Sequence, residues 1–450
     1  MNRPNVHART VSRRAFFGMA GGVAGAALLG GCGGGNGGAG GAGGNGGTGG
    51  GGSPSGQLNY WTLLDPNGED PRGKAERQIF DIFEERTDLT VVEQVIPWQN
   101  IDPNLVAAVQ AGNPPEVSRI NYYNFQMHVN AGSLQPLQEM AERDYSVEEL
   151  DDFVIKLEGQ DGIEALLIEN VGNAMFLRKD WLAEAGVEAP RTWDEFITVG
   201  KALTDVHPEA SGFLTFGSTA ESGQVAYLFQ PMIMGRGGRI LNEDGQAAFN
   251  EEAGIETYEF LRSLVYEHEI MPSDAATMAY SEQIDAFIAG RVGMIIEGSH
   301  RYARILEGVG AENLEVVTIP GPTQEQPSPC SITGWAMAIP QGSPNVEGAW
   351  ELLKHRTDPQ MQEIWAEVAF GLPTRTSTLE LPFFQTEESA ILRWWLEYMK
   401  TNGELTVAPK ADAQLNKVMA EAMQEVLLDS SSSVSEVLQR AADQYNAAAS

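Results

Sequence analysis

The chain has 450 residues, enough for two or more domains of the usual size of about 100–200 residues. Hydrophobic residues make up 42% of it, which excludes a membrane protein of many spans and a wholly disordered chain. Acidic residues outnumber basic ones by 62 to 29, giving a formal net charge of −33. This charge excludes nucleic acid as a partner, because phosphate binding needs a basic surface.

The acid excess has two explanations that stay open. Only 8 of the 29 basic residues are lysine. A protein that works in concentrated salt would tolerate this composition, because salt at 1 M shortens the Debye length to roughly 3 Å and screens self-repulsion. A genome rich in G and C would also replace lysine by arginine.

The N-terminus has the features of an export signal. Ser12–Phe17 contains the paired arginines of a twin-arginine signal, and the apolar stretch Gly18–Leu29 is too short and too rich in glycine to span a membrane. Leu29–Cys32 resembles a lipoprotein processing site. We therefore expect residues 1–31 to be a signal peptide and Cys32 to be the lipidated first residue of the mature chain. Cleavage there removes four arginines and no acids, which takes the net charge to −37.

Residues 32–56 are expected to form a flexible tether, since they are almost entirely glycine and small polar residues. A lipid, a tether and a folded body together predict a protein anchored to the outer face of the cytoplasmic membrane. Cys330 is the only other cysteine, so the body has no internal disulfide. That agrees with twin-arginine export, which carries proteins that have folded in a reducing compartment.

The folded body begins with strands that alternate with helices. Strands are predicted at Leu58–Leu64, Val91–Ile96 and Glu116–Ile120, with helices around Ala75–Phe83 and Leu105–Val109 between them. This alternation predicts a parallel sheet whose ligand crevice lies at the carboxyl ends of its strands. The side chains expected on that rim follow the strands, and they are Asp65, Trp98 with the polar turn Gln99–Asp102, Asn121, Tyr122 and Tyr123.

A second unit starts near Asn173. Thr192 and Glu195 form a capping box that opens a helix running to Leu203. Further strands are predicted at Phe213–Phe216, Val292–Ile296 and Gly334–Pro340. The C-terminal region is helical, with an apolar stripe from Leu415 to Val426, a break at Ser430–Ser433, and a last helix capped by Ser433 and Glu436.

No motif for catalysis, phosphate binding or metal binding occurs in the chain. HExxH, CxxC, GxSxG and GxxxxGK[ST] are all missing, and the histidines are scattered singly without the spacing of metal ligands. The sequence therefore predicts a protein that is not an enzyme and gives no catalytic residue, metal or cofactor.

Aromatic residues instead stand at predicted turns. Trp98, Tyr122, Tyr123 and Trp335 each lie beside a predicted strand end or a glycine, and His300 follows the strand Val292–Ile296 across Glu297–Ser299. Packing in the core explains such positions equally well for single residues. Together, flat rings beside polar side chains suit a sugar, whose C–H faces stack on rings while its hydroxyls form hydrogen bonds.

The order of motifs along the body resembles the extracellular solute-binding proteins (family 1) that serve ABC importers of sugars, the group that includes maltose-binding protein. The resemblance covers nearly the whole body. The matching segments are Tyr60–Thr62, Glu76–Val91, Ala111–Val117, Gly132–Leu137, Arg178–Phe196, Phe287–Gly298, Gly334–Ile339 and Gly371–Arg375.

The resemblance implies an α/β fold of the two-lobe, periplasmic-binding-protein-like (type II) kind with a ligand cleft between the lobes. The N-terminal lobe is expected to contain 57–170 plus 317–371, and the C-terminal lobe 171–316 plus 372–450. The chain would cross between them near Glu169–Gly172, Val316–Pro320 and Gly371–Arg375. The ligand-binding positions that the resemblance implies are Asp65, Trp98, Asn121, Tyr122, Tyr123, Asn173, Glu297, His300, Trp335 and Arg375.

Two positions depart from the family pattern. His300 stands where many members have an aromatic ring, and Met175–Leu177 where many have a pair of tyrosines. Both departures alter the contacts that a sugar would find.

The function implied by the resemblance is capture of a saccharide by lobe closure, followed by delivery to the transmembrane permease subunits. The protein would act as a monomer held at the membrane by its lipid. Two alternatives stay open: the same scaffold could bind a polyamine or another polar solute, or it could serve as a sensory or adhesion receptor.

Overall fold

The computed structural model describes residues 55–159, 161–219, 225–405 and 411–450. The predicted signal peptide, Cys32 and all but the last two residues of the predicted tether lie outside this range. The described residues belong to one unit of the chain, Ser53–Ser450.

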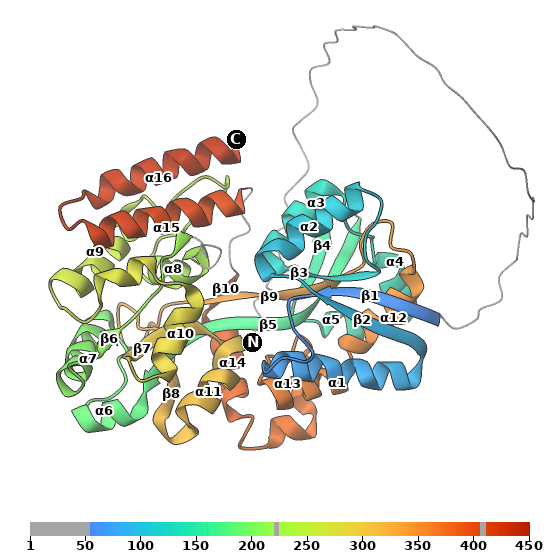
Figure 1. Cartoon of the computed structure of the whole chain (residues 1–450), viewed down its shortest axis with the longest axis horizontal. Coiled ribbons are helices and arrows are strands. Elements are labelled where there is room, and N and C mark those ends of the chain that lie inside the picture. Colours follow the sequence, from blue (N-terminus) through green and yellow to red (C-terminus); the bar gives the residue numbers. More distant parts are fainter. Residues whose placement is uncertain (1–54, 160, 220–224, 406–410) are drawn as a thin grey trace, which may run out of the picture. The chain divides into compact units, whose positions relative to one another are not determined.

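The strands of the described chain form a mixed sheet in the order β2-β1-β3-β9-β5-β7-β6, with β10 beside β9 and both β4 and β8 beside β5 (Figure 1). The first three strands are parallel, as predicted, whereas β9 runs antiparallel to both β3 and β5. The strands are β1 (Ser55–Thr62), β2 (Asp88–Val95), β3 (Val117–Asn121), β4 (Lys156–Gly159), β5 (Gly162–Arg178), β6 (Ser211–Phe213), β7 (Val292–Gly298), β8 (Leu314–Val317), β9 (Cys330–Ala338) and β10 (Gly403–Leu405).

Helices cover the sheet. They are α1 (Pro71–Arg86), α2 (Trp98–Gln110), α3 (Phe125–Ala131), α4 (Gln138–Asp144), α5 (Val147–Asp151), α6 (Lys179–Ala185), α7 (Trp193–Val206), α8 (Val225–Met234), α9 (Glu252–Tyr266), α10 (Tyr280–Ile288), α11 (Tyr302–Val309), α12 (Val346–Arg356), α13 (Pro359–Ala369), α14 (Ala390–Asn402), α15 (Asp412–Leu428) and α16 (Val434–Ala449). Short 3-10 helices that matter for the site are η1 (Tyr122–Asn124) and η4 (Ser299–Arg301).

Local sequence explains several helix starts. The predicted capping box of Thr192 and Glu195 opens α7, and the Ser433 hydroxyl accepts the Glu436 backbone N–H at the start of α16. Two expectations were wrong in detail. Residues Gln99–Asp102 form the first turn of α2 rather than a polar turn, because the helix starts directly after Pro97. The strand expected at Phe213–Phe216 ends at Phe213.

Two long strands join two lobes, each with its own core. β5 pairs with β9 up to Gly172 and with β7 from Asn173 onward, so this one strand passes from the first lobe into the second. One core gathers apolar residues from Leu58 to Ile168 and from Trp335 to Ala369. The other gathers residues from Ala174 to Cys330 and from Ala366 to Tyr445. The fold is therefore α/β with two lobes.

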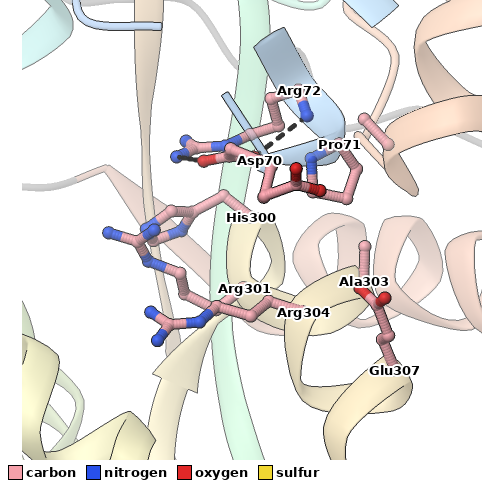
Figure 2. A pocket seen from close by; sticks show the side chains of 10 residues that line it. Asp70, Pro71, Arg72, His300, Arg301, Ala303, Arg304 and Glu307 are labelled. Carbon is pink, nitrogen blue, oxygen red and sulfur yellow. Dashed lines mark hydrogen bonds and ion pairs between the residues drawn. The ribbon is translucent and has the colours of Figure 1, made fainter. Parts of the chain in front are cut away.

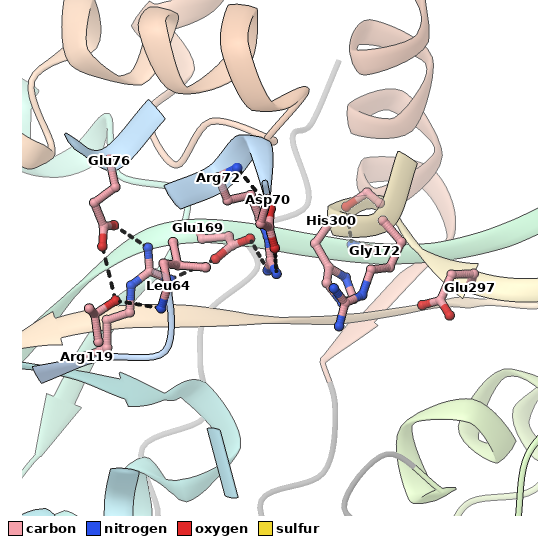
Figure 3. Close-up of polar contacts among 12 residues, drawn as sticks. Leu64, Asp70, Arg72, Glu76, Arg119, Glu169, Gly172, Glu297 and His300 are labelled. Carbon is pink, nitrogen blue, oxygen red and sulfur yellow. Dashed lines mark hydrogen bonds and ion pairs between the residues drawn. The ribbon is translucent and has the colours of Figure 1, made fainter. Parts of the chain in front are cut away.

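A buried network of charges fixes the first lobe where β5 leaves it (Figure 3). Arg119 of β3 is fully buried and donates to Tyr60 Oη at 2.9 Å, to Glu169 Oε2 at 3.0 Å and to Glu76. Arg72, at the start of α1, reaches the other Glu169 oxygen at 3.4 Å. Breaking such a buried pair costs about 3–5 kcal/mol, so α1, β3 and β5 hold one another in place beside the lobe junction.

Candidate functional site

The second lobe contributes a buried carboxylate, Glu297, at the end of β7. Its side chain is 3% exposed, and its Oε1 accepts hydrogen bonds from the Tyr280 hydroxyl at 2.6 Å and from the Gly298 N–H at 2.6 Å. The Tyr280 oxygen also lies 3.1 Å from His300 Nε2. Burial raises the pKa of Glu297 to about 7. Glu297, Tyr280 and His300 thus form one polar cluster.

Two further residues stand beside this cluster. Asn173 lies opposite Gly298 in the β5–β7 pairing, and its Oδ1 accepts the Ser331 N–H at 2.8 Å. A Cβ atom on Gly298 would lie 2.5 Å from His300 Nδ1 and 3.2 Å from the Tyr227 hydroxyl oxygen. Only glycine therefore lets Tyr227 of α8 and His300 approach the strand end so closely.

Several polar atoms on β5, β7, β9 and the neighbouring α8 and η4 have no partners among the described residues. Within the described part of the chain, six buried atoms of this region have no hydrogen-bond partner: Asn170 Oδ1, Asn173 Nδ2, Tyr227 Oη, Glu297 Oε2, His300 Nδ1 and Thr333 Oγ1. Thr333 lies opposite Val171 where β9 and β5 cross between the lobes. An unmet buried polar group costs about 1–3 kcal/mol. Buried polar groups are rarely left without a partner, so a water or a ligand would be expected to complete these bonds.

The first lobe brings Asn121 and Trp335 together. Asn121 ends β3 directly opposite Trp335 of β9, and Trp335 is in turn opposite Glu169. The Asn121 side chain accepts the Tyr123 N–H at 3.2 Å, which starts η1 and places Tyr122 and Tyr123 after the strand.

A chain of hydrogen bonds fixes the backbone of Asn121, where β3 ends and η1 begins. Asp102 Oδ1 accepts the Asn121 N–H at 3.1 Å and meets His128 Nε2 at 2.9 Å, while His128 Nδ1 meets Ser133 Oγ at 2.8 Å. Aspartate, histidine and serine in this order would suit nucleophilic catalysis. All three are at most 1% exposed, so no substrate reaches the serine and the chain serves to position Asn121.

Residues of the first lobe act electrostatically on residues of the second. Burial, with the added effect of Cys330, Glu297, Tyr280 and Tyr123, raises the pKa of Tyr227 well above its usual value. Tyr123 belongs to the first lobe and Tyr227 to the second. Seven of the ten expected residues stand on the strands that join the lobes or on the elements next to them: Asn121, Tyr122, Tyr123, Asn173, Glu297, His300 and Trp335.

The other three expected residues lie differently. Asp65 is exposed and its Oδ1 accepts the Asn67 N–H at 2.9 Å, while Trp98 is the half-buried first residue of α2. The Arg375 guanidinium donates to Asp152 Oδ2 at 2.8 Å and lies 4.7 Å from the centre of the Phe153 ring. It is thus occupied by contacts beside α5.

A pocket of about 400 Å³ opens beside the polar cluster (Figure 2). The start of α1 supplies one wall with Asp70 and Arg72, and η4 and α11 supply the facing wall with His300, Arg301 and Arg304. Asp70 and Arg72 form an ion pair at 2.8 Å. Both acidic and basic side chains line this pocket.

Sequence reasoning missed Tyr227, Tyr280 and Thr333. Each is a single polar residue in an apolar or ordinary segment, and only the fold brings them next to Glu297 and Asn173. Within the described ranges, no three metal-ligating side chains gather, and none of the helices combines the length and hydropathy that crossing a bilayer requires.

The model of a known family, described as bacterial extracellular solute-binding protein, matches residues 66–363. The chain belongs to this family. This confirms the family expected from the motifs, and the relatives of this solute-binding protein are binding proteins rather than enzymes.

Two curated relatives are similar over part of their length. The diacetylchitobiose-binding protein DasA of Streptomyces coelicolor is 26% identical over 284 residues, which cover 60% of this chain and 63% of DasA. The arabinooligosaccharide-binding protein of Halalkalibacterium halodurans is 23% identical over 312 residues, which cover 66% of this chain and 67% of that protein. The match to DasA therefore spans less than two thirds of that relative.

A solved structure matches the fold more completely. The GacH receptor of Streptomyces glaucescens, known without ligand and with acarbose, superposes with a TM-score of 0.75 at 20% identity. The superposition covers 88% of this solute-binding protein and 99% of the receptor. At this identity the similarity shows the fold alone, and it is the two-lobe α/β fold.

Proposed function

We propose that this solute-binding protein captures a saccharide at the junction of its lobes and delivers it to the permease of an ABC importer. The observation that carries the proposal is the set of buried polar atoms without partners in the described chain, on the strands that join the lobes and on the elements beside them, among them Asn173 Nδ2, Tyr227 Oη and Glu297 Oε2. A saccharide offers hydroxyls to such atoms and C–H faces to aromatic rings such as that of Trp335. The names of two relatives, which bind diacetylchitobiose and arabinooligosaccharides, support the same ligand class.

Capture follows from having contacts in both lobes. A ligand held by Asn121, Tyr122, Tyr123 and Trp335 on one side and by Glu297 on the other favours the closed state by the difference between its affinities for the closed and open states. His300, Asn173 and the newly found Tyr227 complete the second side. We propose lobes of 57–170 plus 317–371 and of 171–316 plus 372–450, in which Ile319 and Cys330, from the 317–371 span, pack into the core of the second lobe. We also propose Asp65, Trp98 and Arg375 as ligand contacts of the closed state.

The proposal includes the place where the protein works. We propose that it leaves the cell by the twin-arginine route, that Cys32 carries a lipid, and that residues 33–56 tether a monomeric body to the outer face of the cytoplasmic membrane. The paired Arg13 and Arg14, the box Leu29–Cys32 and the glycine-rich stretch support this. A glycine-rich tether of this kind lets the body reach a permease.

Titration calorimetry of residues 57–450 against oligosaccharides and against polyamines tests the ligand class. Saturable binding of a saccharide that the variant Trp335→Ala weakens is the expected result. Tight binding of a polyamine with no saccharide bound would overturn the proposal.

A further inference from the structure

Glu297 presents a carboxylate oxygen that nothing in the described chain satisfies. Its Oε1 is fully used by Tyr280 and Gly298, while Oε2 is buried without a partner. Figure 3 shows Glu297 on the second-lobe side of the crossing strands, apart from the ion pairs that link Asp70, Arg72 and Glu169. Oε2 therefore has a bonding capacity that a water or a ligand would have to meet.

Three elements face Glu297, and the one cation among their side chains, Arg301, only partly offsets the rise in the pKa of Glu297 that burial causes. From α8 comes Tyr227 and from α10 Tyr280, both with pKa values raised by burial. From η4 come His300, whose pKa burial lowers well below its usual value, and Arg301. The Arg301 Nε donates to the Tyr280 hydroxyl oxygen at 3.4 Å, and its guanidinium lies 5.3 Å from the centre of that ring. Among the described residues no cation forms an ion pair with Glu297.

Three other buried carboxylates have an arginine or a histidine as partner. Glu76 and Glu169 both form ion pairs with Arg119, and Asp102 is bonded to His128. A buried charge without a partner is costly, so a protein that keeps one either protonates it or leaves it for something that binds. Glu297 has no such partner, and its Oε2 has no hydrogen bond within the described chain.

We infer that Glu297 selects a saccharide that carries a protonated amino group, which its Oε2 binds as an ion pair between the rings of Tyr227 and Tyr280. This inference rests on the proposed function and narrows its ligand class to amino sugars. The two rings favour a cation as well, because the face of an aromatic ring attracts positive charge. A neutral hydroxyl would also satisfy Oε2, but without the attraction between opposite charges that an ammonium group adds at a buried site.

The test compares matched sugars that differ only at the nitrogen. We would titrate the protein near neutral pH with chitobiose and N,N′-diacetylchitobiose, and with glucosamine and N-acetylglucosamine. The free amine should bind roughly tenfold more tightly than its acetylated twin. Glu297→Gln keeps an acceptor for Tyr280 but loses the charge. In this variant the affinities for the free amine and for its acetylated twin should agree within about twofold. Glu259→Gln, at an exposed position of the same lobe, removes one charge far from the ligand and should leave the preference intact.

A pH series on the unchanged protein keeps the test decisive if the Gln variant does not fold. Because burial raises the pKa of Glu297 to about 7, lowering the pH from about 7.5 to about 5.5 protonates the carboxylate while the sugar amine becomes fully charged, so the preference for the amine should shrink although more of the amine carries its charge. Equal or tighter binding of the acetylated sugars overturns the inference and leaves the proposed function intact. Failure of every saccharide to bind the folded protein overturns both.

Discussion

Tyr227→Phe should make the protein more stable and a weaker binder at the same time. The side chain is 6% exposed and its hydroxyl has no partner within the described chain. A buried hydroxyl without a partner costs about 1–3 kcal/mol, so removing it should raise the free energy of unfolding of the unliganded protein by about 1 kcal/mol. If the same hydroxyl bonds to the saccharide, its loss should cost about 0.5–1.5 kcal/mol of binding, or roughly a 2- to 13-fold weaker Kd.

Tyr398→Phe is the matched control in the same lobe. The Tyr398 hydroxyl donates to the Ser328 carbonyl at 2.8 Å and accepts the Ile319 N–H at 3.1 Å. Removing it leaves both backbone groups without this partner and should lower the free energy of unfolding by about 1–3 kcal/mol, with no change in Kd.

Urea unfolding of the unliganded variants and calorimetric titration with the best saccharide measure both quantities. The two tyrosines should shift stability in opposite directions, and only Tyr227→Phe should shift Kd. A loss of stability in Tyr227→Phe equal to that in Tyr398→Phe, or an unchanged Kd, would refute the idea that this hydroxyl is kept for the ligand.

Four further outcomes are expected. Cys32→Ala should release the protein from the membrane fraction, as followed by immunoblotting, because the variant has no site for the lipid. Two acyl chains on Cys32 would anchor the protein firmly, whereas a single chain binds at only about 10⁴ M⁻¹. Full retention of the variant would contradict the anchor. The melting temperature should rise between low and molar KCl, since salt screens the net charge of −33, and a flat or falling curve would favour genome composition over adaptation to salt. Trp335→Ala should weaken saccharide binding roughly 5- to 150-fold from a loss of about 1–3 kcal/mol, and should also lower stability by about 3–5 kcal/mol because the ring is buried in the first core; an unchanged Kd would remove Trp335 from the site. Glu297→Gln should stabilise the unliganded protein by an amount on the order of 1–3 kcal/mol above about pH 7, because the folded wild type there holds an ionised carboxylate in a buried site. This gain in stability should vanish as the pH falls through about 7 toward the usual pKa of a glutamate. A gain that is constant with pH would show that the Glu297 carboxyl does not titrate in this range.

Short-range signals in the sequence predicted much of the fold. The Thr192 and Glu195 capping box marks the start of α7 because both of its bonds form within one turn of the helix. The first three strands were found because each is a short apolar run bounded by polar turns. β5 was not, since its residues from Ile163 to Leu177 are all buried and so show no alternation of polar and apolar side chains.

The site was predictable only where a residue follows a recognisable strand or motif. Asn121 follows a predicted strand, and Glu297 belongs to the family-like segment Phe287–Gly298. Tyr227 carries no such signal, because its importance comes from the approach of α8 to Gly298, which is a contact between segments distant in the chain. Arg375 shows the converse: its position in the motif suggested a free cation, whereas Asp152 holds its guanidinium at 2.8 Å.

A crystal structure with the tightest-binding saccharide of the panel tests the central claim most directly. We expect polar atoms of the saccharide within hydrogen-bond distance of Tyr227 Oη, Asn173 Nδ2 and Glu297 Oε2, the atoms that lack partners in the described chain. A saccharide bound elsewhere, such as in the pocket between Arg72 and Arg304, with those three atoms still unpartnered, would contradict it.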